Sequence, residues 1–109
     1  MLILFDNNTP RGLARFLASH SVVEARTRGW DQLVNGELIA VAEQADFEVM
    51  VTADKNIRHQ QNLGARKIAL VVLENSQWPM VKLVAEKIVA AINAARPGSY
   101  VEVGVPFKE

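Results

Sequence analysis

The chain has no cysteine, no net charge and no long hydrophobic run, and each absence removes a class of function. Without cysteine it has no disulfide framework, thiolate metal site or cysteine nucleophile, and a reducing compartment is the simplest setting. Twelve basic and twelve acidic side chains give formal neutrality, which argues against binding to nucleic acid by bulk charge. The apolar start, Met1 to Phe5, is too short for a signal peptide or for a membrane span of roughly 20 residues. We therefore expect a cytoplasmic protein with no membrane partner.

The residues that are present suffice for one folded domain. The chain has 109 residues, of which 50% are hydrophobic. A chain of this length and composition has room for one real core, which excludes a disordered or linker-like protein. No repeat and no low-complexity segment divides it, so we expect a single domain over residues 1–109.

Segments typical of strands alternate with segments typical of helices along the chain. Short apolar runs predict strands at residues 2–5, 21–25, 48–52, 67–73 and 100–103. Apolar residues at helical spacing predict a helix capped by Thr9 with Pro10 in its first turn, a helix from Asn35 to about Ala45, and a long helix that Trp78 opens. Gly64 is expected to end a short segment before the fourth strand. Residues 27–31 are expected to be loop, and the second strand, which is short and charged, should lie at a sheet edge.

This alternation predicts the fold class. Parallel strands need crossover connections, and those crossovers are almost always right-handed. We therefore predict an α/β fold, a three-layer α-β-α sandwich with a mostly parallel five-stranded sheet. The expected strand order is 2-1-3-4-5, which makes the first and third strands neighbours.

Two of the apolar runs end on an aspartate, Asp6 and Asp54. If the first and third strands are neighbours, these carboxylates lie side by side at the edge where open parallel sheets bind ligands. Glu37 stands in the first turn of a helix that begins at the same edge. Like charges so close would repel one another without a counterion. Since no Cys or His is near these acids, ligation by oxygen alone favours Mg²⁺ or Mn²⁺ over Zn²⁺.

Each of these residues also has a purely structural interpretation. Asp54 is a suitable N-cap for the segment that follows it, and Glu37 complements the dipole of its helix. Asp6 follows a buried run, so it needs a partner, which could be a metal, an arginine or backbone amides. Trp30 is interpreted as packing or as a contact between subunits, which leaves a homodimer open, and the alternative is that it stacks on a nucleotide base. Every charged residue from Asp31 to Asp54 is acidic, and four of these acids are expected to form a solvated face: Asp31, Glu43, Asp46 and Glu48.

Three motifs carry a resemblance to a known family. They are Leu4-Phe5-Asp6-Asn7-Asn8 followed by Thr9-Pro10-Arg11-Gly12-Leu13, then Asn35-Gly36-Glu37-Leu38, then Val51-Thr52-Ala53-Asp54-Lys55-Asn56. With these motifs nearly the whole chain resembles the PIN-like nuclease domains, and within them the compact branch similar to VapC-type toxins of bacterial toxin-antitoxin pairs. The resemblance implies a metal-dependent ribonuclease with an RNA substrate and a cognate antitoxin protein as partner.

The resemblance also assigns roles to individual residues. Asp6, Glu37 and Asp54 match the metal-binding catalytic acids, and Thr52 stands near them as a supporting hydroxyl. The implied reaction is phosphodiester hydrolysis, in which Mg²⁺ or Mn²⁺ polarises a phosphoryl oxygen and lowers the pKa of a bound water. Further side chains are candidates for contacts to the metal-bound water or to substrate phosphates: Asn8, Lys55, Asn56, Arg11 and Arg58.

Two positions depart from the family pattern and leave alternatives open. Asn7 and Asn56 stand where relatives are acidic, and a less charged site holds its metal more weakly. One alternative is therefore a catalytically degenerate PIN-like domain that serves as a binding or regulatory module. Another is a phospho-acceptor receiver domain with Asp54 as acceptor, although Leu73-Glu74 stands where a receiver needs a hydroxyl after its fourth strand.

Overall fold

The computed structural model describes residues 1–57 and 66–107, and the described chain is built around a five-stranded sheet. The strands are β1 (Leu2–Phe5), β2 (Ser21–Glu24), β3 (Val49–Thr52), β4 (Ala69–Leu73) and β5 (Tyr100–Val103). Their order is β2-β1-β3-β4-β5, and every neighbouring pair is parallel. The α/β class, the strand order and the edge position of β2 are thus confirmed, and the sheet is wholly rather than mostly parallel.

Burial explains why β3 and β4, two of the three interior strands, are almost entirely apolar in sequence. Every residue of both strands is buried, because helices cover both faces of a parallel sheet. The edge strands β2 and β5 are more exposed. In the register of β1 and β3, Phe5 lies opposite Val51, and the Asp6 N–H donates to the Val51 carbonyl at 2.9 Å. The segments that follow these two strands therefore leave the sheet together.

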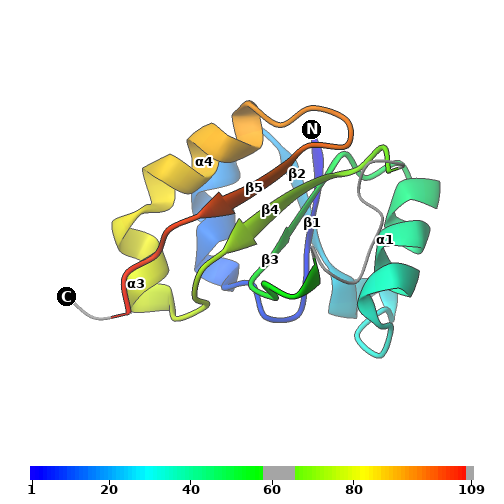
Figure 1. The fold of residues 1–109 in the computed structure, drawn as a ribbon, viewed down its shortest axis with the longest axis horizontal. Coiled ribbons are helices and arrows are strands. Elements are labelled where there is room, and N and C mark those ends of the chain that lie inside the picture. The colour runs from blue at the N-terminus through cyan, green and yellow to red at the C-terminus, as the bar shows by residue number, and fades with distance from the viewer. Residues whose placement is uncertain (58–65, 108–109) are drawn as a thin grey trace.

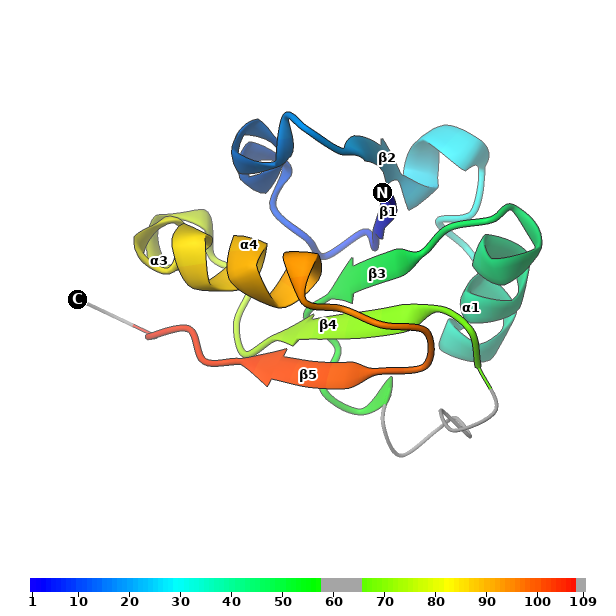
Figure 2. The ribbon, with the colours of Figure 1, turned by 90° about the horizontal axis from the view of Figure 1, so that it is seen from above.

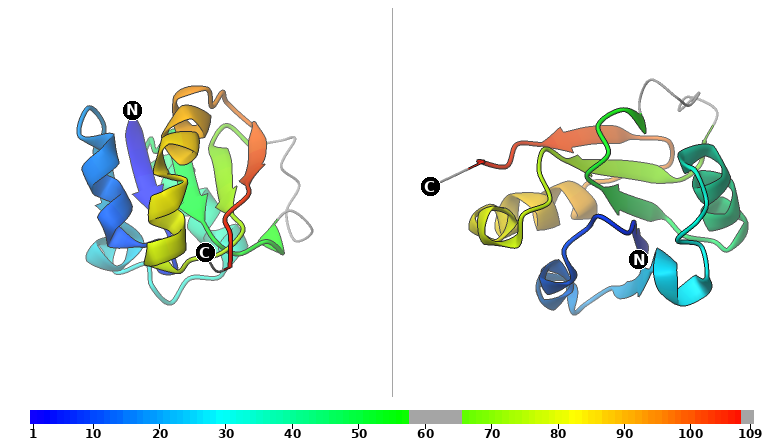
Figure 3. Two further views of the ribbon diagram at one scale, coloured as in Figure 1. Left: turned by 90° about the vertical axis from the view of Figure 1, so that its left-hand side faces the viewer. Right: turned by 90° about the horizontal axis from the view of Figure 1, so that it is seen from below.

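Helical segments cover the two faces of the sheet unequally. The 3₁₀ helix η1 (Arg11–Leu17) and the helices α3 (Trp78–Leu83) and α4 (Ala85–Asn93) lie on one face, and α1 (Asn35–Gln44) lies on the other (Figure 1 and Figure 2). Figure 3 shows η1 beside α3 and α4, which it contacts. Each face has its own apolar core, one centred on Phe5, Val71 and Ile88 and the other on Leu4, Met50 and Ile39. The described elements therefore form three layers.

The first helix differs from its prediction in type and in its cap. The segment is a 3₁₀ helix that begins at Arg11, with Pro10 at the N-cap and no side-chain cap. The Thr9 hydroxyl, which was expected to cap it, is buried and donates to the Val51 carbonyl at 2.7 Å. A strand carbonyl at the end of the sheet thus competes successfully for this hydroxyl.

The other boundaries agree with expectation in part. Residues 25–28, of which 27–28 were expected to be loop, form a second 3₁₀ helix, η2 (Ala25–Arg28), which ends at Gly29 with a left-handed φ of 75°. The long helix expected after Trp78 is interrupted at Val84, which has φ −118° and ψ 20°. The proposed end at Gly64 lies outside the described residues. Over residues 1–57 and 66–107, no helix has the length and apolar character needed to cross a bilayer.

Candidate functional site

Asp6 and Asp54 leave the sheet at the carboxyl ends of the neighbouring strands β1 and β3. At this point the chain changes its winding direction. The connection from β1 to β2 runs through η1 on one face, and the connection from β2 to β3 runs through α1 on the other. Crevices at such a point are the usual ligand sites of open α/β sheets.

The hydroxyl of Thr52, the last residue of β3, connects the two acidic residues. Thr52 is fully buried. Its Oγ1 donates to Oδ2 of Asp6 at 2.8 Å and accepts the backbone N–H of Asp54 at 3.1 Å. Since a hydroxyl has one proton and two lone pairs, a single side chain can serve both contacts. Thr52 therefore orients the Asp6 carboxylate relative to the backbone of Asp54.

Amide groups hold the carboxylate of Asp54. Asn35, in the first turn of α1, donates from Nδ2 to Oδ2 of Asp54 at 2.6 Å, and the Asn56 N–H donates to Oδ1 at 3.0 Å. The second bond is a local turn contact of the kind that aspartate often makes, in line with the structural interpretation of this residue. The first bond brings the start of α1 to the site. Sequence reasoning did not single out Asn35, although its place two residues before Glu37 in the helix start was the available signal.

Glu37 lies in the same turn of α1 but makes a local contact. Its exposed carboxylate accepts the backbone N–H of Val34, the N-cap residue, at 3.3 Å. This contact supports the helix start through a hydrogen bond, whereas the structural interpretation from the sequence had given Glu37 only a favourable interaction with the helix dipole. Over residues 1–57 and 66–107, no three Asp, Glu or His side chains gather closely enough to hold a metal ion together. The structure thus brings Asp6 and Asp54 together around Thr52 and leaves Glu37 at the neighbouring helix start.

The loop after β1 is tied to the end of β3. The Asn8 carbonyl oxygen, Oδ1, accepts the Ala53 N–H at 2.9 Å, and the Asn7 N–H donates to Oδ1 of Asp6 at 2.8 Å. Each carboxylate oxygen has two lone pairs, so these single donors leave acceptor capacity on Asp6. Carboxylate, amide and hydroxyl oxygens are the donor set that suits Mg²⁺ or Mn²⁺. The residues at this edge therefore fit such an ion in their chemistry.

Among the residues that the structure describes, the side chains of the remaining candidates for phosphate contacts make no hydrogen bond or ion pair with the carboxylates of Asp6 and Asp54. Arg11 pairs through Nε with Oε1 of Glu24 at 3.0 Å. Lys55 is exposed, and its ammonium lies 5.9 Å from the centroid of the Phe107 ring. The Asn56 side chain is exposed, and Arg58 lies outside the described residues.

A different arginine reaches the loop of Asp6. Arg26 of η2 makes a long contact, 3.5 Å, from Nη2 to the backbone carbonyl of Asn7. The sequence analysis gave this arginine no role in the site. Its place in the site depends on η2 lying beside the loop after β1, which no sequence pattern reports.

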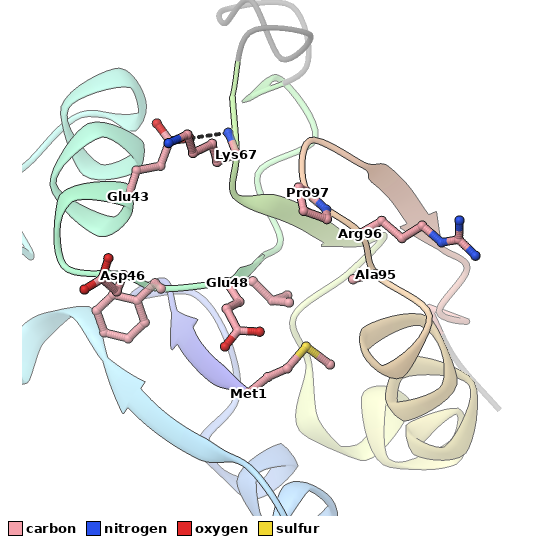
Figure 4. Close-up of a pocket in the computed structure, with 10 residues that line it drawn as sticks. Met1, Glu43, Asp46, Glu48, Lys67, Ala95, Arg96 and Pro97 are labelled. Carbon is pink, nitrogen blue, oxygen red and sulfur yellow. Dashed lines mark hydrogen bonds between the residues drawn. The ribbon is translucent and has the colours of Figure 1, made fainter.

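A separate pocket of about 260 Å³ lies at the opposite end of the strands, where β1 and β3 begin (Figure 4). It contains Glu43 of α1, which was expected to be solvated. That prediction is wrong, because Oε2 of Glu43 accepts the backbone N–H groups of Lys67 at 2.5 Å and Ile68 at 3.1 Å, and Oε1 accepts Arg66 Nη1 at 3.2 Å. The other acids of the expected solvated face are exposed as predicted: Asp31, Asp46 and Glu48.

The protonation of Glu43 follows from these contacts. Burial by itself raises the pKa of the Glu43 carboxyl, but the N–H groups of Ile68 and Lys67 and the guanidinium of Arg66 together hold this pKa below its usual value. Glu43 is therefore an ionised residue of α1 that is hydrogen-bonded to the residues directly before β4. It belongs to the fold rather than to the Asp6–Asp54 site.

At the carboxyl ends of β1 and β3, the described chain thus has two acidic residues that follow neighbouring strands, next to an arginine and the start of a helix. Its chemistry is that of oxygen ligands for a hard cation, with polar groups on both sides. Comparisons of the chain with protein-family models, with curated proteins and with solved structures found no match.

Proposed function

We propose that this protein is a metal-dependent ribonuclease of PIN-like type that hydrolyses RNA phosphodiesters with Mg²⁺ or Mn²⁺. The observation that carries the proposal is that two acidic residues, Asp6 and Asp54, follow neighbouring parallel strands, and that the buried Thr52 hydroxyl donates to the Asp6 carboxylate and accepts the backbone N–H of Asp54. The donors that reach these two carboxylates are uncharged amide and hydroxyl groups, so they leave the negative charges unbalanced. A bound cation would balance that charge.

In this proposal the residues divide the work. When bound, the cation would polarise a phosphoryl oxygen and acidify a water. Asp6 and Asp54 bind the ion, and Thr52 keeps Asp6 in place by donating to its Oδ2. Glu37 stands two residues after Asn35, which touches Asp54. From that turn its carboxylate is the group that orients the attacking water and takes its proton.

The surrounding polar side chains serve the substrate. Phosphate contacts supply affinity without reading the base. In the proposal these contacts come from Asn8, Lys55, Asn56, Arg11 and Arg58. To bind a phosphate, Arg11 has to leave its ion pair with Glu24. The Arg11 side chain is mostly exposed, so this ion pair is weak enough to be exchanged.

The same proposal includes a cellular setting. The protein acts in the cytoplasm as the toxin of a toxin-antitoxin pair, either as a monomer or as a homodimer. An antitoxin reading frame next to the gene is the observation that tests this part. Isolation of the expressed protein as a complex with the product of that frame would support it.

Metal binding is tested by thermal unfolding with and without Mn²⁺. An ion that binds only the folded state raises the midpoint temperature, so we expect a rise for the natural chain and a smaller or absent rise for Asp6→Asn. The matched control is Asp46→Asn, an exposed position at the opposite end of the strands. There asparagine suits the left-handed φ of 66°. An equal Mn²⁺ response in Asp6→Asn and Asp46→Asn would contradict the proposed site.

Catalysis is tested with single-stranded and structured RNA in the presence of Mn²⁺. Asp6→Asn and Asp54→Asn should abolish cleavage, while Asp46→Asn should cleave as the natural chain does. Cleavage that survives both site substitutions would identify a contaminant or a different site. Full activity in EDTA would contradict a metal-dependent reaction.

A catalytically degenerate PIN-like binding module is the second candidate. The observation that favours it is that amide N–H groups already donate to the carboxylates of Asp6 and Asp54. Asn35 and the Asn56 backbone donate to the Asp54 carboxylate, and the Asn7 backbone and Thr52 donate to the Asp6 carboxylate, so each carboxylate oxygen already has one hydrogen-bond partner. RNA binding without cleavage, together with no thermal response to Mn²⁺, would support this candidate over the nuclease.

A further inference from the structure

A pocket of about 290 Å³ lies next to Asp6 at the same edge of the sheet. It is lined by Asn7 from the loop after β1, Arg26 from η2 and Asp31 from the loop before α1. Its volume lies just below the range for small-molecule sites, roughly 300 to 1,000 Å³. A group bound here would therefore be a neighbour of the group bound between Asp6 and Asp54.

Local bonds in the loops bring these three residues together. Asn7 Nδ2 donates to the backbone carbonyl of Asp31 at 3.0 Å, and Arg26 Nη2 contacts the backbone carbonyl of Asn7 at 3.5 Å. The Trp30 N–H donates to the Ala25 carbonyl at 3.0 Å, which folds residues 29–31 back over η2. The wall of the pocket is thus held by hydrogen bonds to main-chain carbonyls, and none of these bonds involves the Asp31 carboxylate.

The polar groups of the pocket form a donor–acceptor pair. Arg26 is exposed and has five N–H donors, of which the long contact to Asn7 engages one group. Asp31 is exposed, and among the residues that the structure describes its carboxylate accepts one long bond, 3.4 Å, from Gln32. The guanidinium of Arg26 and the carboxylate of Asp31 therefore belong to residues that line the same pocket.

This charge pattern selects between two kinds of occupant. A phosphate would gain from Arg26 but would be repelled by Asp31. A neutral, planar group with acceptors along one part of its edge and donors along the next part would use both residues. Unstacked bases of single-stranded RNA are read in this way along their Watson–Crick and Hoogsteen edges.

We propose that the pocket of Asn7, Arg26 and Asp31 binds a guanine base next to the phosphodiester that the protein cleaves. Guanine presents O6 and N7 as acceptors, which suit a bidentate arginine. Its N1–H and N2 amino group are two adjacent donors, which suit a carboxylate. Adenine, cytosine and uracil lack this combination of paired donors beside paired acceptors. Asp31 thereby becomes a specificity residue of the site, and Arg26 its partner.

This inference rests on the proposed function in one respect, that the ligand is RNA. Its test measures binding in EDTA, where cleavage cannot occur. The probes are fluorescently labelled short uridine oligonucleotides that differ only in one central nucleoside, which is guanosine, adenosine or inosine. Fluorescence anisotropy should show the guanosine probe bound at least about fivefold more tightly than the adenosine probe. Inosine, which lacks the N2 amino group, should fall between them.

Substitutions separate the contribution of each group. Asp31→Asn should remove most of the preference for guanosine over inosine. Arg26→Gln should weaken the binding of the guanosine probe more than the binding of the adenosine probe. The matched controls are Asp46→Asn and Arg96→Gln, both exposed and lining the pocket at the opposite end of the strands. Neither control should change the guanosine preference, and the thermal midpoint of each variant reports that it is folded.

The outcomes distinguish this inference from the function beneath it. Mn²⁺-dependent cleavage that needs Asp6, combined with equal affinity for the guanosine and adenosine probes, would overturn the guanine pocket alone. A guanosine preference that survives Asp31→Asn would also overturn it. Binding of none of the probes would contradict the RNA substrate itself and the guanine pocket with it. Guanosine-selective binding without any cleavage would support the pocket and contradict the nuclease.

Discussion

Replacing Glu43 with alanine should lower the stability of the fold by removing one carboxylate. That carboxylate accepts the N–H groups of Lys67 and Ile68 and pairs with Arg66. Lys67 is exposed, so water can replace its lost acceptor. Ile68 is only 2% exposed, so its N–H is left with poor access to water. The start of β4 therefore loses its connection to α1.

The size of the effect follows from that unpaired group. Leaving a buried donor unsatisfied costs about 1–3 kcal/mol. For a domain near this size, 1 kcal/mol corresponds to a shift of about 4–8 °C in Tm. We therefore expect Glu43→Ala to lower the free energy of unfolding by about 1–3 kcal/mol and Tm by roughly 4 °C or more.

The same carboxylate gives the stability a dependence on acid. Its pKa is lower in the folded chain than its ordinary value of 4.5, so the unfolded chain binds the proton more tightly. The stabilisation is therefore fully present above about pH 4.5 and is lost as the pH falls through the folded pKa. Glu43→Gln keeps the shape of the side chain but has no charge, so it should show a weaker fall in stability over this acid range.

Urea unfolding, followed by circular dichroism at neutral pH and through the acid range, measures both effects. The matched control is Glu86→Ala, because Glu86 is an exposed glutamate on α4, and its loss should change stability by no more than about 0.5 kcal/mol. The reasoning is refuted if Glu43→Ala unfolds at the same urea concentration as Glu86→Ala. An acid dependence that is identical in the natural chain and Glu43→Gln would refute the electrostatic part.

Two further substitutions test the packing and the site. Gly12→Ala would place a Cβ 2.6 Å from Cε2 and Cζ2 of the Trp78 indole, so we expect a loss of about 1–3 kcal/mol in urea unfolding; Gly104→Ala, with no atom within 4 Å of its new Cβ, should not be destabilised, and equal losses would contradict the steric explanation. Thr52→Val keeps the volume but removes the hydroxyl between Asp6 and the following loop, so it should lower stability by about 1–3 kcal/mol and reduce the rise in Tm caused by Mn²⁺. An unchanged Mn²⁺ response in Thr52→Val would show that the hydroxyl does not orient Asp6 for metal binding.

Several features of the site were predictable because they follow from short-range patterns. A buried parallel strand is mostly apolar, so β1 and β3 were recognisable, and the aspartate that follows each apolar run was recognisable with them. The adjacency of Asp6 and Asp54 then required only the strand order, which the alternation of elements restricts to few choices. The start of α1 at Asn35 was likewise visible in the spacing of its apolar residues.

The contacts that give these residues their surroundings were not predictable in the same way. Thr9 was a reasonable helix cap by its type, but the Val51 carbonyl, distant in sequence, accepts its hydroxyl instead. Glu43 was a reasonable surface acid, but the segment before β4 returns to α1 and encloses it. The interruption at Val84 occurs without proline or glycine, and nothing in the local sequence marks it.

The sequence by itself determined the α/β class, the five strands and the two acids that end β1 and β3, since each depends on the apolar or polar character of neighbouring residues. Only the tertiary structure decided that Thr52 joins those acids, that Asn35 reaches Asp54, and that Arg26 and Asp31 share a pocket beside them. The physical reason is the range of the interactions. Periodicity reports which face of an element is buried, whereas a hydrogen bond between distant side chains depends on where each loop returns to the sheet.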